Sequence, residues 1–264
     1  MNKQKIDVRQ PTFGFPDEEL TTSLHDEIVL WLKRNAEAIS RQLIRWTETW
    51  DPHLIESNKK RAAATVATRM DLLRETLTKE RSRLERMERG ESRLYVAQDL
   101  EKRIEAMSAE LTFLSSWNGL GGPPAPRLDV RCELEHRIFR RRYEASDIAG
   151  FIDVVLSARA LRLNAGIVPS DDYGRPYLGI DAKTYADWNV RWTDFRRFAF
   201  DAKTTIRSLG QLIRQFKAYR TYSKLPLYAV SPDSRFAKEI SDEGFGFIRY
   251  PDAVITLPKN SICR

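Results

Sequence analysis

An acidic and a basic side chain end a short apolar run in the second half of the chain, in the order Asp201-Ala202-Lys203. In a β-strand, residues two apart lie on the same face, so this carboxylate and this ammonium group would point in the same direction. A carboxylate can bind a hard divalent cation, and a lysine can stabilise negative charge that builds on a phosphate. The pair therefore indicates chemistry on a phosphate ester.

A helical pattern follows this strand end within a few residues. Its apolar side, at spacings of three and four, consists of Leu209, Leu212, Ile213 and Phe216. A neighbouring polar stripe offers two amides and a phenol, at Gln211, Gln215 and Tyr219. A strand that ends in an acid and a base, backed by such a helix, suits a metal-dependent phosphodiesterase. We therefore take residues 197–222 as the candidate active site.

A second carboxylate lies upstream, at Asp153, in the middle of the apolar run AGFIDVVLSARA. The preceding segment, LDVRCELEHRI, alternates apolar and polar residues, which predicts a half-buried strand over residues 128–138. The two segments are expected to pair. Asp153 and Asp201 would then stand on adjacent strands and supply hard oxygen ligands for one or two Mg²⁺ ions.

Near the start of the chain, a helix is expected in LHDEIVLWLKRNAEAI, at residues 24–39. Leu24, Ile28 and Trp31 form one apolar face, and Glu27 is expected to sit within that face. A carboxylate in that position lies either at the rim of the packed side or beside a functional site.

Between this helix and the strands, the pattern is almost entirely helical. Two runs with heptad-like spacing, joined by a turn at residues 89–91, predict an antiparallel helical hairpin. The Gly- and Pro-rich segment that follows reads as a linker. The predicted organisation is a leader and first core helix at 1–41, the hairpin at 42–118, the linker at 119–126 and an α/β core at 127–264.

Within that core, residues 164–194 are irregular and are expected to be an insertion between strands. This insertion repeats the candidate motif as Asp181-Ala182-Lys183-Thr184. No helix with glutamine and tyrosine follows the repeat, so we favour the copy at Asp201 and Lys203. Strand, helix, strand, helix, strand in the remainder predicts a mixed sheet flanked by helices.

Ile152-Asp153, Asp201-Ala202-Lys203 and the Gln215–Tyr219 segment together resemble the PD-(D/E)xK nuclease superfamily, which has the restriction-endonuclease-like fold. The last segment is similar to the glutamine/tyrosine helix motif of the RecB-type and lambda-exonuclease-type branches. The resemblance covers the first helix and residues 128–250, with the helical hairpin as an insertion outside it.

This resemblance implies a set of roles for the site residues. Mg²⁺, or Mn²⁺ in its place, would be bound by Asp153, Asp201, the Ala202 carbonyl and Glu27. Lys203 would lie near the attacking water or the phosphate, and Gln215 and Tyr219 would steady the lysine or the phosphate backbone. Contacts to nucleic acid are expected from Arg207, Gln211 and Arg214.

The composition narrows the partners. A net charge of +7 and a pI near 9.4 favour a polyanion such as DNA over an acidic substrate. No apolar run approaches the roughly 20 residues of a membrane span, and the first residues contain no signal-peptide core, so a cytoplasmic protein is expected. The distant Cys132 and Cys263 argue against a zinc ribbon or a disulfide scaffold.

Three functions remain open on these grounds. The first is a Mg²⁺-dependent DNA nuclease of a restriction, phage-defence, repair or transposition system, with the helical hairpin binding DNA, another protein or a second copy of the chain. The second is an inactive nuclease-fold subunit that binds DNA or scaffolds a larger complex. The third is a helical adaptor that does not bind nucleic acid.

Overall fold

The computed structural model describes residues 23–88, 94–142, 145–165 and 186–259. These residues form a mixed α/β fold, with a long helical hairpin and a mixed sheet flanked by helices, as the sequence predicts. The sheet is open and has seven strands. The chain divides into two compact units. One unit comprises residues 1–46, 128–160 and 194–264, and the other comprises residues 47–127 and 161–193.

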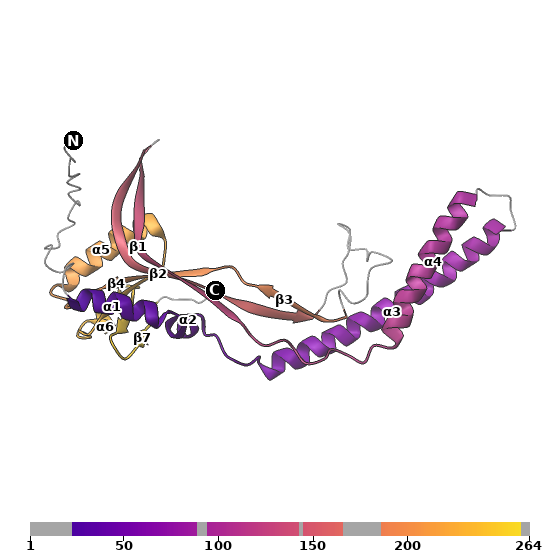
Figure 1. Cartoon of the computed structure of the whole chain (residues 1–264), viewed down its shortest axis with the longest axis horizontal. Coiled ribbons are helices and arrows are strands. Elements are labelled where there is room, and N and C mark those ends of the chain that lie inside the picture. Colours follow the sequence, from indigo (N-terminus) through magenta and orange to yellow (C-terminus); the bar gives the residue numbers. More distant parts are fainter. Residues whose placement is uncertain (1–22, 89–93, 143–144, 166–185, 260–264) are drawn as a thin grey trace, which may run out of the picture. The chain divides into compact units, whose positions relative to one another are not determined.

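The first unit is organised around the sheet (Figure 1). Its strands are β1 (Leu128–Arg142), β2 (Ala145–Ala165), β4 (Arg196–Ala202), β5 (Leu227–Ser231), β6 (Gly246–Arg249) and β7 (Val254–Thr256), in the spatial order β1-β2-β4-β5-β6-β7. β2 runs antiparallel to both of its neighbours in this order, β1 and β4. β4, β5 and β6 are parallel to one another, and β7 is antiparallel to β6. The carboxyl ends of the parallel strands β4, β5 and β6 lie on the same side of the sheet, and the loops that follow these strands meet there.

Helices cover both faces of this sheet. One face packs against α1 (Ser23–Arg34) and α2 (Ala36–Ile44), and the other against α5 (Leu209–Ser223) and α6 (Ala237–Asp242). Alternation along β4 divides its side chains between the faces: Phe200 packs with the α1/α2 cluster and Ala199 with the α5 cluster. Each face is therefore apolar, and β4 is buried on both sides.

The first helix that the sequence predicts is in fact two helices. The break is at Asn35, whose side-chain Nδ2 donates to the Trp31 carbonyl at 2.9 Å. Asparagine side chains compete with the backbone for such bonds, which makes asparagine a poor residue for a helix interior. Of the helices that lie in the described residues, none is both long and apolar enough to cross a membrane.

The second unit contains the hairpin of α3 (Pro52–Glu88) and α4 (Leu94–Ser115), together with β3 (Trp188–Trp192). The hairpin core consists of Val66, Leu73, Leu77, Met107 and Leu114, with Ala186 packed among them. β3 pairs antiparallel with the last residues of β2, Leu161–Ala165. Residues 161–193 therefore group with the helical hairpin.

Two tryptophan side chains anchor backbone segments within this second unit. Trp117 Nε1 donates to the Ala186 carbonyl at 2.9 Å, and Trp188 Nε1 donates to the Gly121 carbonyl at 3.0 Å. Gly121 belongs to the segment that the sequence predicts as a linker. That segment is thus held against β3 by a hydrogen bond.

Candidate active site

The two aspartates that the sequence singles out lie opposite each other on β2 and β4. The last pair in the register between these strands is Val154 with Phe200, so the next position brings Asp153 and Asp201 face to face. The Ala202 amide donates to Asp153 Oδ2 at 2.7 Å. Strand pairing therefore gathers two carboxylates at the end of β4.

Asp153 lies where the paired strands β1 and β2 twist sharply. On β2, Val154 packs with the α1/α2 cluster, whereas Ile152, two residues earlier, packs with the α5 cluster. Residues two apart normally share a face, so the strand twists sharply between them. On β1, Glu135 lies between the partners of these two residues and has a φ of 52°, in the left-handed region. This irregularity accompanies the turn of Asp153 toward the β4 backbone.

Lys203 forms an ion pair with Asp201 inside the protein. Lys203 Nζ lies 2.9 Å from Asp201 Oδ2, and the side chains are 9% and 4% exposed. The Lys203 amide donates to the Val230 carbonyl at 2.8 Å, which continues the pairing of β4 with β5. Burial raises the pKa of Asp201 to about 6; Asp153 adds to this rise and the Lys203 ammonium opposes it.

The helix α5 brings Gln215 and Tyr219 to the same place. Gln215 Nε2 donates to Tyr219 Oη at 2.8 Å. Burial, reinforced by the Asp201 and Asp153 carboxylates, raises the pKa of Tyr219, so its phenol stays protonated. Among the described residues, none donates a hydrogen bond to the buried Gln215 Oε1. A buried acceptor of this kind is commonly satisfied by water or a ligand.

Tyr219 can pack closely against β2 because Gly150 has no side chain. A Cβ atom at this position would lie 2.9 Å from Tyr219 Cε1. The phenol ring therefore packs directly on the strand backbone, three residues before Asp153 along β2.

His25 is a member of this site that the sequence analysis did not single out. It lies on α1 and is buried, with Nε2 3.4 Å from Asp153 Oδ2 and Nδ1 3.5 Å from Asp26 Oδ1. Its hydrogen bond to Asp153 raises the pKa of His25, although burial alone would lower it. His25, Ile28 and Leu32 share the buried stripe of α1 at spacings of three and four. In the sequence, His25 could have been recognised as a polar side chain on the apolar stripe of this helix.

The prediction that Glu27 sits within the apolar face of its helix is wrong, because this side chain is exposed. Successive residues of a helix are about 100° apart, so Glu27 points well away from the direction of Ile28. Among the described residues, no group of three or more histidine, cysteine, aspartate or glutamate side chains is arranged so that it could hold a metal ion. Glu27 thus does not join the two aspartates as a third carboxylate.

Of the three residues expected to contact nucleic acid, Arg207 lies just before α5, and Gln211 and Arg214 lie in its first two turns. Arg207, Gln211 and Arg214 are all exposed. Ser208 is the N-cap of the helix, and its side chain accepts from the Gln211 amide at 3.4 Å. The second copy of the motif, at Asp181 and Lys183, lies outside the described residues.

The residues present are compatible with a Mg²⁺ site in which the protein supplies only a few of the ligands. Mg²⁺ keeps several waters and is commonly bound through one or two carboxylates. Asp153 and Asp201 supply two carboxylates on facing strand positions, and the buried Gln215 Oε1 leaves an acceptor without a donor in the described chain. This donor set, rich in oxygen and without a thiolate, suits a hard cation.

Comparison with known proteins gives no further guide. No family model matches the chain, and no curated protein or solved structure gives a match.

Proposed function

We propose that this protein is a divalent-metal-dependent deoxyribonuclease with a PD-(D/E)xK site on a restriction-endonuclease-like sheet. The observation that carries the proposal is the meeting of Asp153, Asp201 and Lys203 at the end of β4, with Gln215 and Tyr219 of α5 close by. These residues come from three elements, and their meeting depends on the sheet order.

Asp153, Asp201 and the Ala202 carbonyl would hold the Mg²⁺ or Mn²⁺ ion. When bound, the ion would neutralise the scissile phosphate and lower the pKa of an attacking water. The chain contributes position and charge. The Ala202 amide fixes the Asp153 carboxylate, and β4, buried on both faces, fixes the direction of Asp201.

Lys203 supplies a fixed positive charge beside the carboxylates. Its ammonium group is held at 2.9 Å from Asp201 in a site with little solvent, where charge interactions are strong. A phosphate that enters beside Asp201 would meet this ammonium as negative charge develops. Tyr219 stays protonated and can donate a hydrogen bond to a phosphate oxygen.

DNA is the proposed substrate because the protein is basic and exposed arginines lie in and just before α5, the helix that carries Gln215 and Tyr219. The chain carries a net charge of +7, and Arg207 and Arg214 are exposed beside the start of α5. Binding through such side chains releases counterions from the DNA, so affinity should fall as salt increases.

A second candidate is an inactive nuclease-fold subunit that binds DNA. The buried ion pair between Lys203 and Asp201 favours it, because Lys203 already neutralises one of the carboxylates that a metal ion would need. The two candidates differ in whether a cation can compete with this ammonium for Asp201.

The deciding experiment measures Mg²⁺- and Mn²⁺-dependent cleavage of single-stranded, duplex and branched DNA by the purified full chain. Lys203→Ala should lower kcat by roughly 10²–10³-fold, the cost of removing one preorganised charge from a transition state. DNA affinity in EDTA should stay nearly unchanged. Lys217→Ala is the matched control, because Lys217 is an exposed lysine of α5 that pairs with Glu243.

Cleavage that persists in both Lys203→Ala and Asp153→Asn would exclude this site as the nuclease centre. A wild-type protein that binds DNA with strong salt dependence but never cleaves it would instead support the second candidate.

A further inference from the structure

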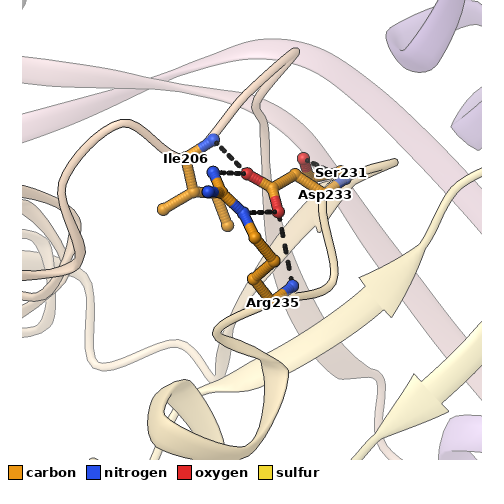
Figure 2. Close-up of polar contacts among 4 residues, drawn as sticks. All are labelled: Ile206, Ser231, Asp233 and Arg235. Carbon is orange, nitrogen blue, oxygen red and sulfur yellow. Dashed lines mark hydrogen bonds and ion pairs between the residues drawn. The ribbon is translucent and has the colours of Figure 1, made fainter.

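The connection that leads from Lys203 to α5 is tied to the loop after β5 by one carboxylate. Asp233 Oδ2 accepts from the Ile206 amide at 3.2 Å (Figure 2). Ile206 lies midway along this connection, residues 203–208, and Asp233 lies between β5 and α6. The bond therefore links the segments that follow two neighbouring parallel strands.

Asp233 is itself fixed from two sides. Arg235 donates through Nε to Asp233 Oδ1 at 2.8 Å and through Nη2 to Oδ2 at 2.7 Å. The Asp233 amide donates to Oγ of the fully buried Ser231 at 3.1 Å. Figure 2 shows the carboxylate between the Ile206 amide and the Arg235 side chain. A bidentate pair of this kind restrains the plane of the carboxylate as well as its position.

The charge of Asp233 is constant over the range in which enzymes are assayed. The hydrogen bonds from Arg235 lower the pKa of Asp233 to about 2. Asp233 is thus a permanent acceptor for the Ile206 amide and has no proton to exchange near neutral pH.

The Lys203–Ser208 connection has three anchors, and Asp233 provides the middle one. At its start, the Lys203 amide donates to the Val230 carbonyl, and at its end Ser208 caps α5. Between them the Ile206 side chain, 3% exposed, packs with Leu212 and other residues of the α5 cluster. Without Asp233, the Ile206 amide would lose the only hydrogen bond that the described residues give it.

We infer that Asp233, oriented by Arg235, is a positioning residue that holds the Lys203–Ser208 connection and thereby sets Lys203 against Gln215 and Tyr219 of α5. This inference rests on the proposed nuclease function. Lys203 and α5 are joined covalently only through this connection, so a slack connection lets the ammonium and the helix move independently. A misplacement of about 1 Å can cost a catalytic site about 10²-fold in rate.

Catalysis and stability should separate at this position. The Arg235 side chain is 67% exposed, and exposed ion pairs contribute little to stability. The same unit offers a matched control, the Asp242–Lys259 pair, in which the last residue of α6 pairs with a lysine at 2.8 Å. Loss of the Arg235 ion pair by itself should therefore change the unfolding midpoint little, as should loss of the Asp242–Lys259 pair.

The experiment compares Asp233→Ala, Asp233→Asn and Asp242→Ala in the full chain. Asp233→Ala should lower kcat by roughly 10–100-fold with KM for DNA nearly unchanged. Asp233→Asn keeps an oxygen that can accept from the Ile206 amide and should recover part of the loss. Asp242→Ala should leave kcat unchanged. Amide hydrogen exchange at Ile206, measured in metal-free protein, should accelerate at least about tenfold in Asp233→Ala alone.

The exchange measurement keeps this inference separate from the proposed function. If the wild type does not cleave DNA, the proposed nuclease activity fails, while faster exchange at Ile206 in Asp233→Ala still supports the positioning role. Unchanged exchange at Ile206 overturns the inference in every case. In an active enzyme, a kcat for Asp233→Ala equal to that of the wild type, or a KM effect without a kcat effect, overturns it as well.

Discussion

Each of the two units contains a buried ion pair, and the two pairs are built differently. In the helical unit, Arg69 Nε and Nη2 donate to the two oxygens of Glu110 at 2.7 and 3.0 Å, and both side chains are almost fully buried. In the sheet unit, Lys203 contacts Asp201 through one oxygen at 2.9 Å, and Asp153 lies on the facing strand.

This difference in geometry suits the two ion pairs to different roles. A planar guanidinium engages both oxygens of a carboxylate and holds the pair in one geometry, which suits a structural contact between two helices. A lysine is a point charge with rotatable donors, and it leaves room for another cation or a phosphate. Next to Asp153 and out of solvent, Asp201 has its pKa raised to about 6. Pairs with strongly shifted pKa values are concentrated at functional sites.

The largest effect is expected from breaking the pair in the helical hairpin. Arg69→Met leaves the Glu110 carboxylate buried without its cation, which should cost about 3–5 kcal/mol of unfolding free energy. The double variant Arg69→Met/Glu110→Leu should return close to wild-type stability, because no charge then remains buried. Urea denaturation followed by circular dichroism measures both.

Arg74→Ala is the control for that experiment. It breaks the exposed pair with Asp71, 3.0 Å apart on the same helix, and should change stability by less than about 1 kcal/mol. Equal stabilities of Arg69→Met and Arg74→Ala would show that the buried pair has no special structural role.

A smaller effect, one that depends on pH, is expected at the other pair. The pKa of Asp201 rises from 3.8 in a free side chain to about 6 in the folded protein, so the folded state holds this proton more tightly than the unfolded state. The unfolding free energy should therefore fall as pH increases from about 4 to about 6, with no further loss from this group above that range. Asp201→Asn should flatten this dependence in urea titrations performed in EDTA.

Asp233→Asn serves as the control for the pH experiment. The pKa of Asp233 is lowered to about 2, so its contribution to stability is lost only as pH falls below about 4. The slope between pH 4 and 6 should then be the same as in the wild type. An unchanged slope in Asp201→Asn would contradict the assigned burial of this carboxylate.

The smallest effect is expected from Gly150→Ala, which disturbs the site without touching either ion pair. The new Cβ would lie 2.9 Å from the Tyr219 ring, so the ring must move. Overpacking of this kind costs about 1–3 kcal/mol, and DNA cleavage should fall because Tyr219 leaves its place beside Gln215. Unfolding and cleavage assays on the same preparation measure both effects.

Gly210→Ala is the matched control in α5. The nearest neighbour of its Cβ position would be Arg214 Nη1 at 3.8 Å, an ordinary contact. Stability and cleavage should remain close to wild type. Full cleavage activity in Gly150→Ala would show that the position of Tyr219 does not matter to the reaction.

The pattern of the chain predicts the mixed sheet, the helical hairpin and the meeting of the two aspartates. Apolar runs predict the strands that contain Asp153 and Asp201, and the structure brings the two residues together through antiparallel pairing of β2 with β4. Heptad-like spacing predicts the antiparallel pair of α3 and α4. The strands and helices themselves depend on residues close together in sequence, where local geometry repeats.

Other parts of the site required the folded chain. The choice between Glu27 and His25 depends on the rotation of α1 about its axis, and a shift of two residues moves the chosen side chain to another face. Asp233 meets Ile206 from 27 residues away, and Arg69 meets Glu110 from 41 residues away. No local period reports such contacts.

By itself, the sequence determined the helical hairpin and the main strands of the sheet, although not the break at Asn35 or the strand β3 within residues 164–194, and it determined which side chains at the end of β4 could act on a phosphate. The tertiary structure alone decided which of those carboxylates are buried and paired, and which residues orient them. The reason is physical: hydrophobic periodicity is a property of neighbouring residues, whereas the burial that raises the pKa of Asp201 to about 6 comes from elements that pack around it from distant parts of the chain.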